Sequence, residues 1–234
     1  SRLPRLGRVL HSLYGDFPVI DDSRYVDFEV AINAPSVFRR IVRRQVSLNC
    51  DGRIPFKPLP LAQAYPMFEW GLNWCIANHA HEFLVIHAAV VERDGRAFIF
   101  PGTPGSGKST LCAALVCRRW RLLSDEMALV SLHDGQLAPV PRPISLKNAS
   151  IPLIQRFDPA ATFGEAVADT AKGTVAHMRA PRASIESARV HATPFCIVFP
   201  RYKEGAECDL RPMSKGSAFM KVAENAFNYH VLGS

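Results

Sequence analysis

The sequence predicts an α/β protein built on a mixed β-sheet that carries a phosphate-binding loop. Residues 102–109 read Gly-Thr-Pro-Gly-Ser-Gly-Lys-Ser, the complete G-x-x-x-x-G-K-[ST] pattern of such a loop. An apolar run at 97–100 precedes the loop and a helical run at 110–116 follows it, which is the strand–loop–helix context that the pattern requires. Hairpin signals lie on both sides of this unit, without the regular strand–helix alternation of a parallel sheet. The sheet is therefore expected to be mixed.

The segment before the loop is expected to contain strands, a hairpin and one helix. Residues 24–33 alternate apolar and polar side chains with a period of two, which is typical of a strand. Residues 45–50 and 53–57 flank Asp51-Gly52, and this pattern predicts a hairpin. Residues 62–80 carry apolar side chains at helical spacing, so we expect a helix there.

Apolar strands joined by tight turns are expected around the loop. Residues 83–91 form an apolar run that Asp94-Gly95 connects to the strand entering the loop. After the helix, residues 121–126 are predicted to form a buried strand that ends in two acids. Residues 127–132 continue extended as far as a third turn at Asp134-Gly135.

Fewer regular elements are expected toward the C-terminus. Residues 144–146 are predicted to form a short strand after a proline-rich stretch. Residues 158–182 are rich in Ala, Gly and Pro and show little periodicity, which predicts a long surface loop. Residues 195–199 are predicted to form a buried strand, and residues 217–229 a helix.

A length of 234 residues favours one domain, or one domain with an appendage, and an apolar fraction of 48% is enough to bury a sizeable core. We predict a strand-rich lead-in with one helix over residues 1–80, packed on a phosphate-loop core over residues 81–234. Neither an apolar run of 18 residues nor a signal-peptide pattern occurs, so no membrane association is expected. The six cysteines are scattered without a C-x-x-C pair, which predicts reduced thiols in a cytoplasmic protein and no zinc site.

The net charge of +7 favours anionic partners such as nucleotides, phosphates and acidic protein surfaces. Arg39, Arg40, Arg43 and Arg44 are expected on one helical face, either as a solvated basic face or as a docking site. The sequence contains no zinc finger, RNP signature or basic stripe interleaved with aromatic residues. Nucleic acid is therefore not an expected partner.

The loop is suited to a nucleoside triphosphate with Mg²⁺. Its glycines let backbone N–H groups turn toward a phosphate, and the following helix N-terminus favours an anion. Lys108 can reach the terminal phosphates, and the Ser109 hydroxyl can ligate Mg²⁺. ATP is the expected nucleotide, because no Asn-Lys-x-Asp guanine motif is present. The predicted nucleotide-binding residues are Gly102, Thr103, Pro104, Gly105, Ser106, Gly107, Lys108, Ser109 and Thr110.

Two acids, Asp125 and Glu126, end the strand that follows the loop's helix, where side chains face the phosphates in such folds. One acid can hold Mg²⁺ together with Ser109, and the other can take a proton from an attacking hydroxyl. The alternative is a pair of exposed turn acids. His87 is either a core residue or a group that orients the acceptor or a phosphate oxygen. The basic run 172–179 is either a clamp on the transferred phosphate or a solvated loop.

The order of these features resembles the catalytic domain of HPr kinase/phosphorylase, a bacterial serine kinase whose fold is related to phosphoenolpyruvate carboxykinase. More closely, three runs are similar to the HPr kinase-related kinase A group, and the resemblance covers roughly residues 80–230. The features that carry it are the strand with His87, the loop 102–109, the Leu-Leu-Ser-Asp-Glu run at 122–126, and the runs 142–148, 172–177 and 226–230.

This resemblance implies an HPr kinase-like fold and assigns roles to individual residues. It makes Asp125 the general base toward a serine hydroxyl and places Glu126 near the metal. It matches His87 to the histidine before the loop, and Arg179 and Arg182 to two arginines of a mobile active-site loop. The family forms hexamers, so the resemblance also implies a homo-oligomer.

From these observations we expect an ATP- and Mg²⁺-dependent kinase that transfers the γ-phosphate to a hydroxyl, most simply a serine of a protein or peptide. The expected catalytic residues are Asp125, His87, Lys108 and Arg179, and the expected metal ligands are Ser109, Asp125 and Glu126. Two alternatives remain open. One is a small-molecule kinase of the same architecture, and the other is an ATP-binding switch without catalysis.

Overall fold

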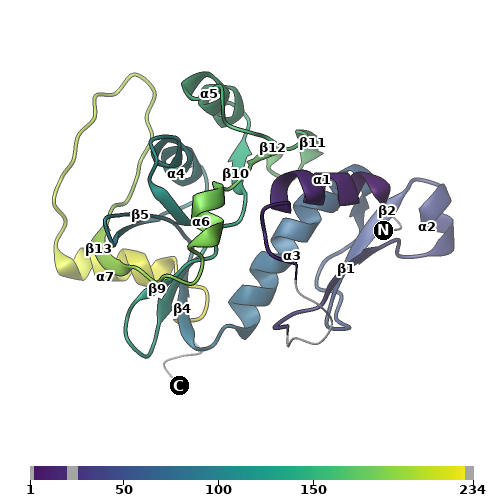
Figure 1. Cartoon of the computed structure of the whole chain (residues 1–234), viewed down its shortest axis with the longest axis horizontal. Helices are drawn as coiled ribbons and strands as arrows, with labels where there is room; N and C mark the ends of the chain where they lie inside the picture. The colour runs from purple at the N-terminus through teal and green to yellow at the C-terminus, as the bar shows by residue number, and fades with distance from the viewer. Residues whose placement is uncertain (1–2, 20–25, 230–234) are drawn as a thin grey trace.

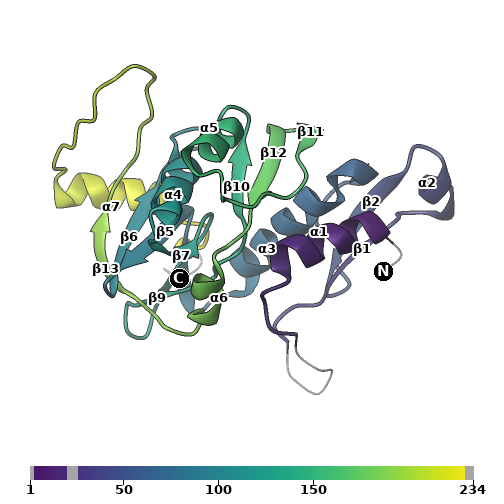
Figure 2. The ribbon, with the colours of Figure 1, turned by 45° about the horizontal axis from the view of Figure 1, so that its top comes forward.

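In the computed structural model, which describes residues 3–19 and 26–229, the chain is a mixed α/β protein with several small sheets. Figures 1 and 2 place β1, β2 and α2 at one end of the molecule and β13 and α7 at the other, with α3 between them. The elements at these ends are α2 (Val37–Ile41), β1 (Val30–Asn33), β2 (Gln45–Cys50), α3 (Ala64–His79), β13 (Thr193–Ile197) and α7 (Lys215–Glu224).

The sheet that carries the loop has the strand order β13-β6-β5-β7 and is mixed, as predicted. Its other strands are β5 (Ala88–Arg93), β6 (Arg96–Pro101) and β7 (Arg121–Ser124). β5 and β6 form the predicted hairpin around Asp94-Gly95, where both residues adopt positive φ angles of 55° and 79°. β13 pairs with β6 in parallel, whereas the other neighbours are antiparallel.

Helix α4 (Lys108–Cys117) begins at the lysine of the loop and packs against this sheet. Its buried face carries Cys112, Ala113 and Val116, which join Leu122 and Ile144 in the largest apolar cluster of the described residues. Two shorter helices, α5 (Ser150–Phe157) and α6 (Arg182–Glu186), add Ile151, Ile154 and Ile185 to the same cluster. Burial of isoleucine side chains contributes about 1.5–3 kcal/mol each, so this cluster holds α4 against the strands.

The predicted single strand over residues 83–91 is two strands, interrupted at His87. β4 (Phe83–Ile86) belongs to a separate sheet with β8 (Ala128–Ser131) and β9 (Leu137–Ala138), while the chain continues into β5. At the break, the His87 N–H donates to the carbonyl oxygen of Asn225 at 2.7 Å instead of joining a ladder. His87 therefore stands where the chain passes from one sheet to the next.

The prediction of a long surface loop over residues 158–182 is wrong. This segment contains β11 (Val167–Thr170) and β12 (Gly173–Met178), and β12 is the central strand of the sheet β10-β12-β11 with β10 (Ile144–Lys147). Most of β12 is buried, so its sequence lacks the apolar–polar alternation of a half-exposed strand. The turn before it is made possible by Gly173, which has a φ of +79°.

The N-terminal elements form a small sheet of order β1-β2-β3, covered by α1 (Pro4–Tyr14) and α3. The predicted return strand 53–57 is absent from the described structure, because pairing after the Asp51-Gly52 turn stops at a bridge between Cys50 and Arg53. β2 pairs instead with β1 and with β3 (Leu59–Pro60), which leads through a 3₁₀ turn (Leu61–Gln63) into α3. Residues 24 and 25 of the predicted first strand lie outside the described residues.

Two further predictions for this end need correction. The four arginines do not share a helical face, since α2 ends at Ile41 and Arg43 adopts a positive φ of 45°. The structure also pairs Cys50 with Cys75 as a disulfide, so the prediction of reduced thiols is wrong for these two residues. The other cysteines, Cys112, Cys117, Cys196 and Cys208, are free.

The C-terminal strand is more exposed than predicted. Phe195 and Ile197 of β13 are exposed, although the Phe195 ring packs against Phe98 and lies under the guanidinium of Arg96. The helix predicted over 217–229 is α7, which ends at Glu224, and the chain then bonds to β4 through Phe227 and Asn228. His230, the last residue of one run behind the resemblance, lies outside the described residues. Among the helices of the described ranges, none has the length and apolar character to span a membrane.

Candidate functional site around residues 102–126

The loop at residues 102–107 connects the end of β6 to the start of α4. Gly107 is the N-cap of α4 with a φ of +97°, a left-handed conformation that a side chain would strain. The first backbone N–H groups of a helix lack partners within it, so the N-terminus of α4 presents donors to an anion. Ser109 and Thr110 lie in this first turn, whereas Thr103, Pro104 and Gly105 are exposed at the tip of the loop.

Lys108 is a buried cation, with only 7% of its surface exposed. Its Nζ atom donates to the carbonyl oxygens of Gly102 at 2.5 Å and Thr103 at 3.1 Å, so the ammonium group is held against the loop. Burial lowers the pKa of Lys108, and the nearby carboxylates of Asp125 and Glu126 oppose this shift. The loop lysine therefore lies near enough to the two acids for their charges to interact.

Asp125 is a buried acid directly after β7, and 5% of its surface is exposed. Its Oδ2 atom accepts a hydrogen bond from the backbone N–H of Ser145 at 2.9 Å, whereas Oδ1 is buried without a hydrogen-bond partner. Burial, and secondarily the charge of Glu126, raises the pKa of Asp125 from 3.8 to about 7, although Ser145 and Ser109 oppose the shift. The group thus changes protonation state near neutral pH.

Glu126 is the charged member of the acid pair. Its carboxylate accepts a hydrogen bond from Asn73 Nδ2 at 2.9 Å and lies 4.0 Å from the ammonium nitrogen of Lys147. Burial alone would raise the pKa of Glu126, but the charges of Lys147 and Lys172 outweigh burial and leave its pKa below the ordinary value. Lys172, from the turn before β12, lies over the ring of Trp70 at 5.5 Å.

His87 belongs to the same group of residues. Its Nδ1 atom lies 3.2 Å from the backbone carbonyl oxygen of Glu126, and a carbonyl can only accept, so Nδ1 carries the proton in this contact. Burial lowers the pKa of His87, and the charge of Lys108 adds to this shift. A neutral His87 therefore leaves its other ring nitrogen as an acceptor.

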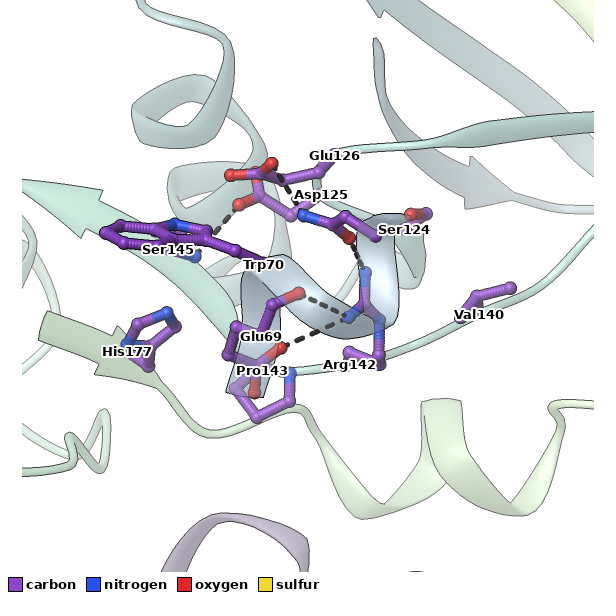
Figure 3. A pocket seen from close by; sticks show the side chains of 11 residues that line it. Glu69, Trp70, Ser124, Asp125, Glu126, Val140, Arg142, Pro143, Ser145 and His177 are labelled. Carbon is purple, nitrogen blue, oxygen red and sulfur yellow. Dashed lines mark hydrogen bonds and ion pairs between the residues drawn. The ribbon is translucent and has the colours of Figure 1, made fainter. Parts of the chain in front are cut away.

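A buried polar network from α3, which the sequence analysis missed, adjoins the acids. Figure 3 shows Glu69 paired with Arg142, at 3.2 Å between Oε2 and a guanidinium nitrogen. Arg142 also donates to Asn73, which in turn donates to Glu126. The hydroxyl of Tyr14 donates to Glu69 at 2.7 Å, and burial together with this carboxylate raises the pKa of Tyr14. The sequence contains one signal for this network: Glu69 lies within the apolar run of α3, and a buried charge requires partners.

The network and the acids line one pocket between α3 and the strands β7, β10 and β12. In Figure 3, Asp125 and Glu126 lie on one side of the pocket and Glu69 with Arg142 on another. His177 of β12 also lines it and packs edge-on against Tyr65 with ring centroids 4.8 Å apart. The lining residues are Glu69, Trp70, Asn73, Ser124, Asp125, Glu126, Val140, Arg142, Pro143, Ser145 and His177.

Arg179 does not lie with these residues. Its guanidinium pairs with Asp16 at 2.7 Å, beside Cys117 at the far end of α4. A ten-residue helix is about 15 Å long, so α4 separates Arg179 from Lys108. Arg182, on α6, pairs with Glu186 at 2.8 Å. The structure therefore brings together Asp125, Glu126, His87, Lys108 and Ser109, but not Arg179. Arg179 directly follows β12, and its N–H donates to the carbonyl oxygen of Thr162 at 2.8 Å, so it does not lie in a mobile loop.

Comparison with known proteins gives one finding. A family model described as "SynChlorMet cassette protein ScmC" matches residues 69–146, about one third of the chain. No curated protein and no solved structure matches the chain. The assignment to an HPr kinase-like family is therefore wrong, because the matching family is a different one. The matched segment, similar to ScmC, includes the loop, both acids and the Glu69–Arg142 pair.

Proposed function

We propose that this protein is an ATP- and Mg²⁺-dependent kinase that transfers the γ-phosphate to a hydroxyl, with a serine of a protein or peptide as the acceptor. One observation carries the proposal. A buried acid with an unpartnered carboxylate oxygen, Asp125, interacts with the buried lysine of a phosphate-loop sequence. A site that only binds a triphosphate does not require a desolvated acid whose pKa is about 7.

The phosphates would lie over the loop between β6 and α4. Backbone N–H groups of Gly105 and of residues 107–109 at the N-terminus of α4 would provide donors for phosphate oxygens, whereas the Ser106 N–H donates to the carbonyl oxygen of Thr103. Lys108 would exchange the carbonyl oxygens of Gly102 and Thr103 for the β- and γ-phosphates. Because phosphate oxygens are charged, these contacts are stronger than those to neutral carbonyls.

The oxygen atoms near the loop fit a hard cation. Mg²⁺ prefers one or two carboxylates together with phosphate oxygens and water, and the Ser109 hydroxyl and the Glu126 carboxylate are such ligands. Within residues 3–19 and 26–229, no three His, Cys, Asp or Glu side chains group closely enough to hold a metal. Phosphates and water would thus complete the shell. When bound, Mg²⁺ neutralises charge on the phosphates.

Asp125 would act as the general base. In the proposed step, the acceptor oxygen bonds to the γ-phosphorus while the bond from that phosphorus to the β–γ bridging oxygen breaks, and ADP leaves. The proton of the acceptor hydroxyl passes to Oδ1 of Asp125, the oxygen that lacks a partner. A base with a pKa near the working pH is suited to this transfer. Positioned acid–base groups of this kind contribute about 10²–10⁴-fold to rates.

The remaining cations balance the charge of the site. Lys147 and Lys172 keep Glu126 ionised, and Lys172 lies near enough to contribute a positive charge beside the phosphates. His87, neutral and fixed by the Glu126 carbonyl, would accept a hydrogen bond from the acceptor or from a water molecule.

The test is transfer of label from [γ-³²P]ATP into a native cell lysate. Wild type should produce alkali-labile phosphoserine, and Lys108→Ala and Asp125→Asn should lower the labelling by at least about 10²-fold. Lys57→Ala, which removes an exposed lysine, is the matched control and should label as wild type does. Equal labelling by all four proteins would refute the proposal. Label only in the low-mass fraction would instead indicate a small-molecule kinase, and ATP binding without transfer or hydrolysis a switch.

A further inference from the structure

The segment that follows β13 returns to the phosphate loop. β13 is parallel to β6, with Ile197 opposite Ile99, so the carboxyl ends of both strands lie at the same edge of the sheet. The Val198 N–H continues this pairing to the carbonyl oxygen of Ile99 at 2.9 Å. In open α/β sheets, ligands bind outside the carboxyl ends of parallel strands. The loop leaves β6 at this edge, and residues 198–203 leave β13 beside it.

Tyr202 is anchored on the loop by its backbone. Its N–H donates to the carbonyl oxygen of Ser106 at 3.0 Å. A Cβ atom built on Gly107 would lie 3.2 Å from the Cβ of Tyr202, so the two residues are in close contact at the start of α4. This contact fixes the place from which the Tyr202 ring projects.

The ring itself is exposed. Tyr202 shows 69% of its surface, and its side chain makes no hydrogen bond or ring contact within the described residues. Arg201 and Lys203 flank it and are exposed as well. The edge of the phosphate loop therefore carries an unpaired aromatic ring between two cations.

We propose that the ring of Tyr202 is the platform on which the nucleobase of the bound triphosphate stacks. The inference rests on the proposed function, since it concerns the nucleotide held by the same loop. Stacking on an aromatic ring uses the π-face that every base has, and the flanking cations favour the phosphates of the same ligand. Stacking on Tyr202 predicts that purine triphosphates bind more tightly than pyrimidine triphosphates, because the larger purine rings overlap more of the tyrosine ring.

The experiment compares two ligands by isothermal titration calorimetry with Mg²⁺ present. ATP carries a base, whereas inorganic tripolyphosphate offers only the phosphates. Tyr202→Ala should weaken ATP binding by about tenfold and leave the tripolyphosphate Kd unchanged. Tyr202→Phe keeps the ring and should bind ATP within about twofold of wild type. Phe219→Ala, which removes an exposed aromatic from α7, is the matched control and should behave as wild type.

Each outcome separates this inference from the proposed function. Unchanged ATP binding by Tyr202→Ala would overturn the stacking role while leaving the phosphate site intact. An equal loss for ATP and tripolyphosphate would also overturn it, because Tyr202 would then only shape the loop through its contact with Gly107. If wild type binds neither ligand, the proposed function itself fails.

Discussion

Asp125 combines burial, an unpartnered oxygen and a neighbouring carboxylate in a single residue. The cost of holding such a charge away from water is usually reduced by partners, but those of Asp125, the Ser145 N–H and the Ser109 side chain, do not offset its burial, and Oδ1 has no hydrogen-bond partner. Groups of this kind destabilise a fold and concentrate at functional sites. The carboxylate of Asp125 should therefore affect both the stability of the fold and the activity, and both can be measured.

Replacing Asp125 with Asn should stabilise the fold. The pKa of Asp125 is raised in the folded state, from 3.8 to about 7, so the folded protein loses stability as the pH rises between these values. Well below pH 4, Asp125 is protonated in both the folded and the unfolded state, so it does not lower the free energy of unfolding. Above about pH 7 it is ionised in both states, and the full loss of stability is present. We expect Asp125→Asn to raise the free energy of unfolding in urea by about 2–4 kcal/mol at pH 8, and by less as the pH falls toward 4.

The control for this measurement is Glu207→Gln, which neutralises an exposed acid and should leave the free energy of unfolding unchanged. A loss of stability in Asp125→Asn at pH 8 would show that the ionised carboxylate has a strong partner in the folded protein. The account of a poised, unpartnered base would then be wrong.

The rate of phosphate transfer should depend on the same ionisation. Asp125 must be deprotonated to accept a proton, so kcat/KM should rise about tenfold per pH unit below pH 7 and level off above it. The measurement is a kcat/KM profile with ATP between pH 5 and 9, after an acceptor has been found in the labelling experiment. A flat profile through pH 7 would remove Asp125 from the role of base.

At the scale of elements, α3 connects the N-terminal sheet to the pocket that holds Asp125 and Glu126. It packs on β1 and β2 with one face and presents Glu69 and Asn73 to Arg142 and Glu126 with another. Tyr14 extends the same network to α1. Two helices that begin far from the loop in sequence thus position groups beside the acids.

Breaking this network should destabilise the fold strongly. Arg142→Met leaves Glu69 buried without its cation, and removal of one partner of a buried pair costs about 3–5 kcal/mol. The midpoint of thermal unfolding should therefore fall by several degrees. Arg182→Met removes an arginine from the exposed pair with Glu186 and should leave the midpoint unchanged. A shift in Arg142→Met no larger than in Arg182→Met would mean that the network does not hold α3 in place.

The sequence predicts those elements that carry a local signal. The hairpin at Asp94-Gly95 and the start of α4 depend on turn residues and glycines, and both lie where predicted. The split at His87 depends instead on a distant backbone carbonyl, that of Asn225, which no local pattern reveals. β12 was missed because burial removes the alternation that identifies a half-exposed strand.

The candidate site was predictable for the same reason only in part. The loop with Lys108, the helix after it and the strand that ends in Asp125 and Glu126 follow one another directly in the sequence. Their order along the chain therefore predicts that the lysine and the two acids lie near each other. Glu69, Asn73 and Arg142 come from elements whose packing depends on long-range contacts. Arg179 was assigned to a mobile loop, but it directly follows the strand β12, and its partner Asp16 lies near the other end of the chain.

At the scale of the whole molecule, the pocket that holds Asp125 and Glu126 lies where β7 of the loop-bearing sheet, the β10-β12-β11 sheet and α3 meet, as Figures 2 and 3 show for the elements and the side chains. A ligand that binds there should stabilise the folded protein as a whole, because only the folded state brings these elements together. Bound at 100 times its Kd, a ligand contributes about 2.7 kcal/mol.

Mg²⁺ and ATP together should therefore raise the midpoint of thermal unfolding. For a chain of this length we expect a rise of about 5–10 °C. Differential scanning calorimetry with and without Mg²⁺ and ATP measures it. Lys108→Ala should show little or no rise, because it lacks the cation that pairs with the phosphates. A rise of equal size in Lys108→Ala would place the nucleotide elsewhere.

The most direct test of the central claim is a crystal structure with Mg²⁺ and a non-hydrolysable ATP analogue. We predict the triphosphate over residues 102–109, with Lys108 Nζ moved from the carbonyl oxygens of Gly102 and Thr103 to the phosphates. The γ-phosphate should lie beside Oδ1 of Asp125, with room for an acceptor hydroxyl between them. An analogue bound away from the loop, or a γ-phosphate that Asp125 does not face, would contradict the account.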